Sequence, residues 1–244
     1  MSLDAPSLQD IREAATRISL FIYRTPLVPL HGWPNVYLKL ENLQPIGSFK
    51  LRGSGNAMEL AGPAGLKNGV YTASAGNMAQ GVAWNARRLG IPCTSIVPDH
   101  APQTKIDAIL RLESGILRVP FEEWWNILVT GKYEGLNGLF IHPVCDFGVM
   151  AGNGTIGLEI LEQLPDVETI LIPYGGGGLS CGIASAVRSI RPDVRIYACE
   201  VETAAPLTAS LSAGEASSIE YTPSFVDGIG GKTVLPQMCL LCER

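Results

Sequence analysis

Short apolar runs alternate along this chain with longer segments in which apolar positions recur every three or four residues. Runs that are apolar at consecutive positions, such as TILIPY at residues 169–174, are typical of parallel strands covered on both faces. The longer segments have the spacing of amphipathic helices. The pattern predicts strands at residues 36–40, 69–74, 94–98, 116–120, 139–143, 169–174 and 195–201. It predicts helices at residues 8–18, 49–60, 78–89, 102–113, 122–130, 150–163 and 179–190.

The regular alternation of strands and helices predicts an α/β fold built on doubly wound, mostly parallel sheet. In such sheets, ligands bind beyond the carboxyl ends of the strands. The turns that follow the predicted strands are therefore the segments in which binding and catalytic residues are expected.

The composition indicates a folded globular protein and narrows the choice of partners. Of 244 residues, 46% are hydrophobic and 17% are charged, which excludes intrinsic disorder. The net charge of −5 argues against nucleic acid, which favours a basic surface. No apolar run approaches the roughly eighteen residues of a membrane helix, and the N-terminus has no basic stretch followed by an apolar core. We therefore expect a cytoplasmic protein that binds neither nucleic acid nor membranes.

Six cysteines and three histidines form no pattern typical of a disulfide framework or a catalytic zinc site. Cys239 and Cys242 make a C-x-x-C pair, but no second pair accompanies it, and no HExxH occurs. The pair lies at the end of the chain rather than at the start of a helix after a strand. We interpret it as incidental.

Four consecutive glycines, Gly175, Gly176, Gly177 and Gly178, lie between the strand TILIPY and a predicted helix. Without side chains, they allow positive φ and let several backbone N–H groups approach one ligand. The unpaired N–H groups and the positive dipole end of the helix act in the same direction, which is typical of a phosphate-binding loop. The Lys-Ser/Thr ending of a nucleoside-triphosphate loop is absent. The alternative interpretation is a tight, flexible turn.

A lysine with apolar neighbours opens the predicted helix at residues 49–60, because Lys50 lies between Phe49 and Leu51. A desolvated lysine has a lowered pKa, and its neutral amine can bond covalently to an aldehyde. A lysine at a helix start is more often solvated, so this stretch alone leaves both interpretations open.

Ser74, Ala75, Gly76 and Asn77 also lie between a predicted strand and a predicted helix. A hydroxyl, an amide and free N–H groups at a helix start suit a carboxylate or a ring oxygen. Ordinary helix capping by Ser74 or Asn77 explains the same residues equally well.

The glycines at residues 152–157 match G-x-G-x-x-G, the pattern of dinucleotide-binding turns. The preceding strand is separated from them, and the acidic residue expected at the end of the next strand is absent. A nicotinamide-dependent oxidoreductase is therefore a minor alternative.

Taken together, the segments SFKLRG, SAGNMAQG and GGGGL resemble the pyridoxal-phosphate-dependent threonine and serine dehydratases, which have the tryptophan-synthase-β fold, or fold type II. The likeness runs from about residue 20 to about residue 231, with the three segments in the family's order and spacing. It implies two lobes with pyridoxal 5'-phosphate in the cleft between them. The large lobe would comprise residues 1–47 and 146–244, and the small lobe residues 48–145.

The resemblance also implies roles for individual residues. Lys50 would hold the cofactor covalently and, once released by substrate, act as the base at the substrate Cα. Phe49 would pack on one face of the pyridine ring, Gly228 would line the other side, and Asn77 would bind the ring 3-oxygen. The phosphate would be held by Gly175, Gly176, Gly177, Gly178 and the backbone of Leu179. The substrate carboxylate would be bound by Ser74, Ala75, Gly76 and Asn77.

The implied reaction is β-elimination from L-threonine or L-serine, which yields a 2-oxo acid and ammonia. Eukaryotic-type racemases of this family carry a serine at the position of Ala75, so the alanine favours elimination over racemisation. A racemase, a β-replacement synthase and a non-catalytic homologue remain as alternatives. The implied partners are a small amino-acid substrate and a second copy of the chain in a homodimer.

The sequence departs from the family pattern at three places. Met78 replaces the usual histidine after Asn77, which predicts altered substrate contacts. Family members continue for several elements beyond MCLLCER, so we expect a chain truncated at its C-terminus, without the group that bonds the pyridine nitrogen. Glu200 matches a family cation ligand, but Pro206 stands where the second acid is expected, so no metal site is predicted.

Overall fold

The computed structural model of the chain describes residues 3–242. Its strands are β1 (Leu27–Pro29), β2 (Tyr37–Lys39), β3 (Val70–Ala73), β4 (Cys93–Pro98), β5 (Gly115–Val119), β6 (Leu139–Phe140), β7 (Thr169–Pro173) and β8 (Arg195–Cys199). Its helices are α1 (Leu8–Ile18), α2 (Lys50–Leu66), α3 (Asn77–Leu89), α4 (Gln103–Leu110), α5 (Phe121–Thr130), α6 (Phe147–Gln163), α7 (Gly178–Ile190), α8 (Pro206–Ala213) and α9 (Pro236–Cys242). A 3-10 turn, η1, covers Glu41–Leu43.

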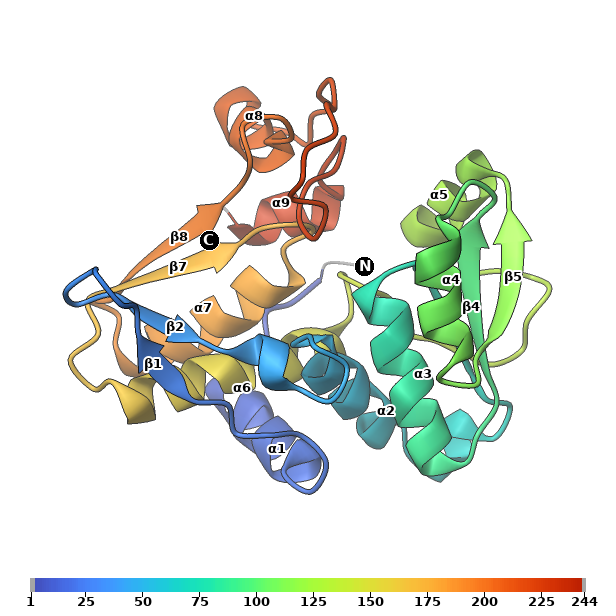
Figure 1. Cartoon of the computed structure of the whole chain (residues 1–244), viewed down its shortest axis with the longest axis horizontal. Helices are drawn as coiled ribbons and strands as arrows, with labels where there is room; N and C mark the ends of the chain where they lie inside the picture. Colours follow the sequence, from blue (N-terminus) through green and yellow to red (C-terminus); the bar gives the residue numbers. More distant parts are fainter. Residues whose placement is uncertain (1–2, 243–244) are drawn as a thin grey trace.

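The strands form a four-stranded sheet and two strand pairs, at opposite ends of the molecule (Figure 1). The larger sheet has the order β5-β4-β3-β6 and is parallel throughout. At the other end, β7 pairs with β8 in parallel, while β1 and β2 pair in antiparallel orientation. The α/β fold with mostly parallel sheet is therefore confirmed.

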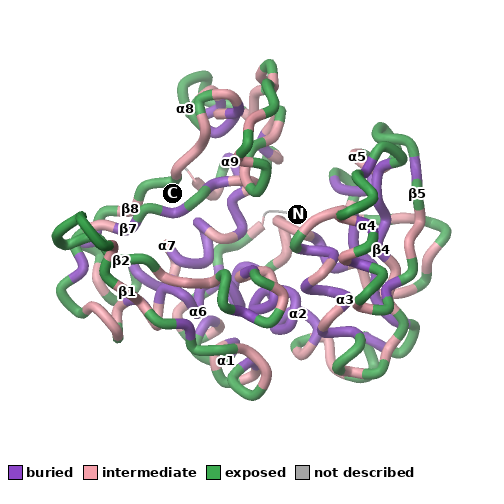
Figure 2. Tube along the Cα trace, viewed as in Figure 1, coloured by how far each residue is buried: buried purple, intermediate pink, exposed green. Residues whose placement is uncertain are grey.

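Helices α2, α6 and α7 make up the middle of the molecule, and α6 packs along both of the others. Figure 2 shows α2 and α6 largely in the colour of buried residues. The G-x-G-x-x-G glycines lie inside α6, not in a turn after a strand. A Cβ at Gly152 would lie 2.5 Å from the carbonyl oxygen of Arg52 on α2, and one at Gly154 would lie 2.8 Å from that of Gly182 on α7. These glycines let three helix backbones approach closely, which accounts for the motif without a nucleotide.

Two hydrophobic cores support the two ends. At the four-stranded sheet, Val70 and Ile141 pack with Met58 and Val82 of α2 and α3. At the β7–β8 pair, Ile170 and its neighbours pack under α6 and α7. The opposite face of the β7–β8 pair is open, because Leu171 and Tyr197 are 66% and 51% exposed. The pair is thus covered on one face only within the described residues, although its sequence reads as a strand buried on both faces.

Most predicted helices and strands begin and end within one or two residues of their observed positions. Helix α1 has the predicted bounds, and Ser7 forms a capping box at its start. The helix predicted at residues 49–60 continues to Leu66 after a break at Gly62, where φ is 62°. The strand predicted at residues 139–143 ends at Phe140, because the backbone then turns around His142. The sequence analysis did not predict β1, η1, α8 and α9, which are too short to show a clear period.

Within residues 3–242, no helix combines the length and the apolar character needed to cross a membrane.

Candidate active site

The four glycines form a loop between β7 and α7, as the sequence predicts. Gly177 caps the helix with φ at 98°, a left-handed conformation that favours glycine. The first intrahelical bond runs from the N–H of Cys181 to the carbonyl of Gly177, so the N–H groups of Gly178, Leu179 and Ser180 have no helical acceptor. The hydroxyl of Ser180 is buried and has no hydrogen-bond partner in the described chain. We call residues 175–178 the glycine loop.

The glycine loop packs closely on Val144, which follows β6. A Cβ at Gly176 would lie 2.6 Å from Val144 Cγ2, and a Cβ at Gly178 would lie 2.9 Å from the Val144 carbonyl oxygen. Side chains at these positions would push the loop away from the β6 turn. A Cβ at Gly175 would only touch Ile229, at 3.9 Å, which brings the segment that contains Gly228 next to the loop.

This difference predicts that Gly176→Ala destabilises the chain by about 1–3 kcal/mol through overpacking, whereas Gly175→Ala changes stability by less than about 0.5 kcal/mol. Urea unfolding of both variants without cofactor measures the difference. Equal stability of the two variants would contradict the close contact between Gly176 and Val144.

Lys50 is the first residue of α2 and points toward the turn after β6. Its Nζ donates a hydrogen bond to the Pro143 carbonyl, at 3.0 Å, and lies 5.2 Å from the centre of the Phe49 ring. Burial of the amine lowers the pKa of Lys50 to about 8. No carboxylate pairs with this amine in the described chain. Near neutral pH, a usable fraction of Lys50 is therefore a neutral amine.

The segment containing Asn77 lies directly against the start of α2. A Cβ at Gly81 of α3 would lie 3.0 Å from the Lys50 carbonyl oxygen and 2.9 Å from Ser54 Oγ. Asn77 is exposed at the first turn of α3, and its side chain makes no hydrogen bond to other described residues. Ser74 Oγ accepts a hydrogen bond from the Gly76 N–H at 3.2 Å. Neither residue caps α3, so their capping interpretation is wrong in this structure.

The start of α2 and the glycine loop thus meet at the turn formed by Pro143 and Val144, and the Asn77 segment adjoins the start of α2 through Gly81. The α2 start contacts the turn through Lys50, and the glycine loop contacts it through Gly176. The Asn77 segment, the Pro143–Val144 turn and the glycine loop follow the carboxyl ends of β3, β6 and β7, where parallel sheets bind ligands, whereas α2 follows η1.

Comparisons with known proteins identify the family of the chain. A family model described as "Pyridoxal-phosphate dependent enzyme" matches residues 18–243, which is most of the chain. The chain belongs to this family. Its cofactor is pyridoxal phosphate.

Two curated relatives are L-threonine ammonia-lyases. The one from Thermotoga maritima is 40% identical over 233 residues, which cover 93% of this chain and 58% of the relative. The one from Geobacter sulfurreducens is 42% identical over 229 residues, which cover 91% of this chain and 57% of the relative. The chain therefore spans less than three fifths of the length of these two relatives.

Solved structures show the same fold. Maize serine racemase superposes with a TM-score of 0.89 at 30% identity, over 98% of this chain and 74% of that one. The processed form of threonine deaminase isoform 2 from Solanum lycopersicum superposes with a TM-score of 0.83 at 32% identity, over 100% of this chain and 72% of that one. The fold-type II architecture expected from the resemblance is thereby confirmed.

The residues present fit the family cofactor. Pyridoxal phosphate carries a phosphate, an aldehyde and a ring oxygen, and each has a matching group in the chain. The glycine loop offers unpaired N–H groups and the unpartnered Ser180 hydroxyl to a phosphate. Lys50 offers an amine with a lowered pKa, and Asn77 offers a free amide. Ser180 is a candidate residue for this site that the sequence analysis missed.

His142 is a second residue that the sequence analysis missed, although it lies near the end of a predicted strand. Its Nδ1 accepts the N–H groups of Val144 and Cys145, at 3.0 and 2.9 Å, so its Nε2 is the donor to the Leu128 carbonyl. Burial lowers the pKa of His142, with a smaller contribution from the nearby Lys50 charge. The neutral ring fixes the turn that receives the Lys50 amine.

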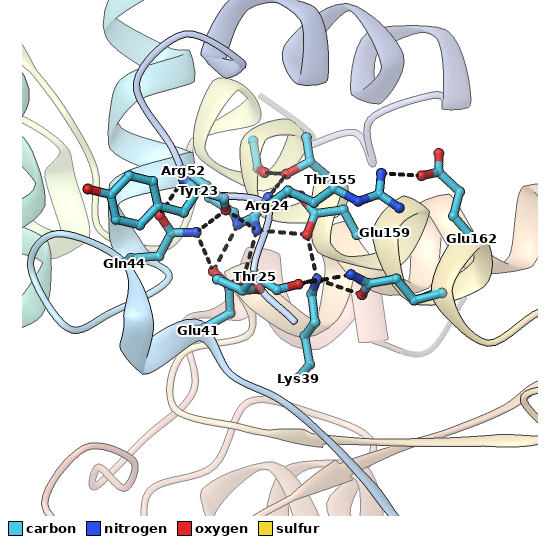
Figure 3. A network of polar contacts seen from close by, with 12 residues as sticks. Tyr23, Arg24, Thr25, Lys39, Glu41, Gln44, Arg52, Thr155, Glu159 and Glu162 are labelled. Carbon is cyan, nitrogen blue, oxygen red and sulfur yellow. Dashed lines mark hydrogen bonds and ion pairs between the residues drawn. The ribbon is translucent and has the colours of Figure 1, made fainter. Parts of the chain in front are cut away.

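A buried ion network fixes the start of α2 (Figure 3). The guanidinium of Arg52 is fully buried and donates to both carboxylate oxygens of Glu41 and of Glu159, at 2.6–3.0 Å. It also donates to Thr155 Oγ1 and the Tyr23 carbonyl. Burial alone would lower the pKa of Arg52, but hydrogen bonds and charge from both carboxylates raise it. Arg52 thus ties α2, two residues after Lys50, to η1 and α6.

Two further sequence expectations concern Met78 and Glu200. Met78 is 2% exposed and packs in the core with Val82 and Val149, so it contacts the core rather than a substrate. Glu200 accepts hydrogen bonds from the N–H groups of Leu207 and Thr208 and from the Thr208 hydroxyl, each at 2.8 Å. Its carboxylate therefore caps α8, and no cluster of three potential metal ligands occurs in residues 3–242.

We therefore expect Glu200→Ala to cost about 1 kcal/mol of stability by removing the α8 cap. The nearby exposed Glu202→Ala should leave stability unchanged. Thermal unfolding with and without a chelator measures both. A chelator effect on the parent chain that Glu200→Ala removes would indicate a cation site instead.

Proposed function

We propose that this chain carries the active site of a pyridoxal-phosphate-dependent ammonia-lyase that converts L-threonine, and also L-serine, to a 2-oxo acid and ammonia. The observation that carries the proposal is the meeting of Lys50 and the glycine loop at the Pro143–Val144 turn, with the Asn77 segment packed against the start of α2. The names of the two L-threonine ammonia-lyase relatives support this reaction.

In this proposal, each group has one task. The N–H groups at the start of α7 and the Ser180 hydroxyl hold the phosphate, while Phe49, Asn77 and Gly228 position the ring. The first turn of α3, with Ser74, Ala75 and Gly76 before it, binds the substrate carboxylate. When bound, pyridoxal phosphate supplies the electron sink for chemistry at the substrate Cα.

Lys50 is the only group in this proposal that moves a proton. Its neutral Nζ takes the proton from the substrate Cα on its own side, and the Pro143 carbonyl orients the amine toward the turn. On the opposite side, Ala75 has no group that can give a proton back. The protonated Lys50 gives its proton to the departing β-hydroxyl, which leaves as water, and no donor on the Ala75 side returns a proton with inversion, which supports elimination over racemisation.

The proposed lobes follow the two sheet regions, with residues 48–145 in the small lobe and residues 1–47 and 146–244 in the large lobe. The four-stranded sheet falls wholly within the first range, and β1, β2, β7 and β8 fall within the second. An ion pair between Lys105 of α4 and Asp227, at 2.8 Å, links the two lobes beside Gly228. Closure of the lobes excludes water during proton transfer. A cytoplasmic homodimer is part of the proposal.

The test is product analysis with the chain saturated with pyridoxal phosphate. We expect 2-oxobutanoate and ammonia from L-threonine, and pyruvate and ammonia from L-serine. Each product is measured beside D-amino-acid formation. D-serine in place of pyruvate would identify a racemase, and a cofactor-bound chain that yields neither product would overturn the proposal.

A further inference from the structure

A group of sulfur and phenol side chains lies beside the glycine loop and takes no part in the proposed reaction. Tyr174, directly before the loop, is 1% exposed. The Cys242 thiol donates to the Tyr174 hydroxyl at 3.9 Å, and Cys242 packs against the cluster of side chains that contains Tyr174 and Cys181. We call Tyr174, Cys181 and Cys242 the thiol cluster.

The thiol cluster joins two helices that are far apart in the sequence. Cys181 lies in the first turn of α7, and Cys242 is the last residue of α9. The two helices are in contact. Met238 of α9 is fully buried, and its Cε would lie 2.9 Å from a Cβ at Gly177. Helix α9 therefore packs directly on the glycine loop.

The two thiols differ in how readily they ionise. The neighbouring Cys181 and Tyr174 side chains lower the pKa of Cys242 to about 7, against an opposing effect of burial. The neighbouring Cys242 side chain and burial raise the pKa of Cys181. Cys242 is also the more exposed of the two, since Cys181 is only 7% exposed. Cys242 therefore has the character of an attacking thiolate and Cys181 that of a resolving thiol.

We infer that Cys181 and Cys242 form a redox-active pair, which small-molecule disulfides such as oxidised glutathione convert to a protein disulfide that fastens α9 to α7. The Cys242 sulfur attacks one sulfur of the small disulfide and releases the other half as a thiol. The Cys181 sulfur then attacks Cys242 and releases the second half. The protein thiols lose two protons and two electrons, and one small disulfide becomes two thiols.

The other nearby cysteines are poorer candidates. Cys145 is close to Cys181, but burial and the adjacent Asp146 raise the pKa of Cys145 to about 12. Cys239 lies on the same face of α9 as Cys242, one turn earlier, and is 2% exposed. The chemistry of the pair is independent of the ammonia-lyase proposal, so its test uses neither cofactor nor substrate.

The experiment is non-reducing peptide mapping of the chain after incubation with oxidised glutathione and alkylation of the remaining thiols. We expect a Cys181–Cys242 disulfide and the loss of two alkylated sites, both reversed by dithiothreitol. Cys181→Ala should stop at a glutathione adduct on Cys242, and Cys242→Ser should form neither product. Cys199→Ser, a matched control at the end of β8, should behave as the parent chain.

Three outcomes would overturn the inference. They are a stable glutathione adduct on Cys242 of the parent chain, a bond from Cys242 to Cys239, and a bond from Cys181 to Cys145. Mapping of the parent chain decides between them even if a variant fails to fold. Fastening of α9 is measured separately, as a rise in Tm of about 5 °C on oxidation. A disulfide that leaves Tm unchanged would refute that fastening.

Discussion

Replacing Lys50 by alanine is expected to abolish the visible absorption band that the chain develops with pyridoxal phosphate. The Lys50 amine lies at the Pro143–Val144 turn, on which the glycine loop packs. Because burial lowers its pKa to about 8, a usable fraction is in the neutral form that bonds to an aldehyde near neutral pH. Ammonia-lyase turnover should fall with the band, by at least about 1,000-fold, since the same amine moves the proton.

The measurement is an absorption spectrum of Lys50→Ala beside the parent chain, followed by borohydride reduction and peptide mapping. Lys132→Ala is the matched control, because the Lys132 side chain is 72% exposed and has no role in the proposed site. It should retain the band. A reduced label on a lysine other than Lys50 in the parent chain would disprove the assignment.

The lowered pKa of Lys50 also determines whether the labelling rate and the stability of the chain rise or fall with pH. The neutral amine is the reactive form, so the rate of labelling should rise with pH and reach half its plateau near pH 8. Between about pH 8 and 10.5, the unfolded chain binds a proton at Lys50 that the folded chain has lost. The free energy of unfolding without cofactor should therefore rise across this window.

Lys50→Met isolates this contribution to stability. At pH 7 the parent chain folds with a charged amine in a desolvated position, which costs about 3 kcal/mol. The methionine variant should be more stable by a similar amount at pH 7, and its stability should lack the rise above pH 8. Urea unfolding at several pH values tests both, and parallel pH profiles of the two proteins would contradict the pKa.

The second large effect is expected from Arg52→Met, which should destabilise the folded chain by about 3–5 kcal/mol. Arg52 is fully buried, and its guanidinium compensates the carboxylates of Glu41 and Glu159. Removal of the cation leaves two partly buried acids to be desolvated without a partner, although Lys39 still pairs with Glu159. The expected loss therefore exceeds that of an exposed ion pair.

Arg24→Met is the control for this prediction. Arg24 pairs with Glu162 at 2.5 Å, but the two side chains are 57% and 59% exposed, so the pair should contribute at most about 1 kcal/mol. Urea unfolding of both variants at pH 7 without cofactor measures the difference. Comparable losses would mean that solvent reaches the Arg52 network.

The Arg52 network also bears on the site. Arg52 lies one half-turn after Lys50 and ties the start of α2 to η1 and α6. In Arg52→Met molecules that remain folded, Lys50 should label with pyridoxal phosphate more slowly than in the parent chain, because its helix is less firmly held. Arg52 is thus a positioning residue for the Lys50 amine.

The sequence by itself determined most of the helices and strands and the segments that could carry binding or catalysis. Local periodicity is enough to identify α1, α7 and the central strands, because a helix or strand displays its buried face within a few residues. The glycine loop was identifiable for the same reason, since its function depends on backbone groups that adjoin one another in the chain. The resemblance of three short segments to a known family then indicated the cofactor.

Only the tertiary structure decided which distant groups meet. Three contacts join residues far apart in sequence: the Lys50 amine with the Pro143 carbonyl, Arg52 with its two acids, and Cys242 with the cluster that contains Cys181. The structure also shows that the G-x-G-x-x-G segment is a site of contact between helices and that Glu200 caps a helix. Burial, pKa and ion pairing depend on neighbours in space, and no local pattern of residues specifies those neighbours.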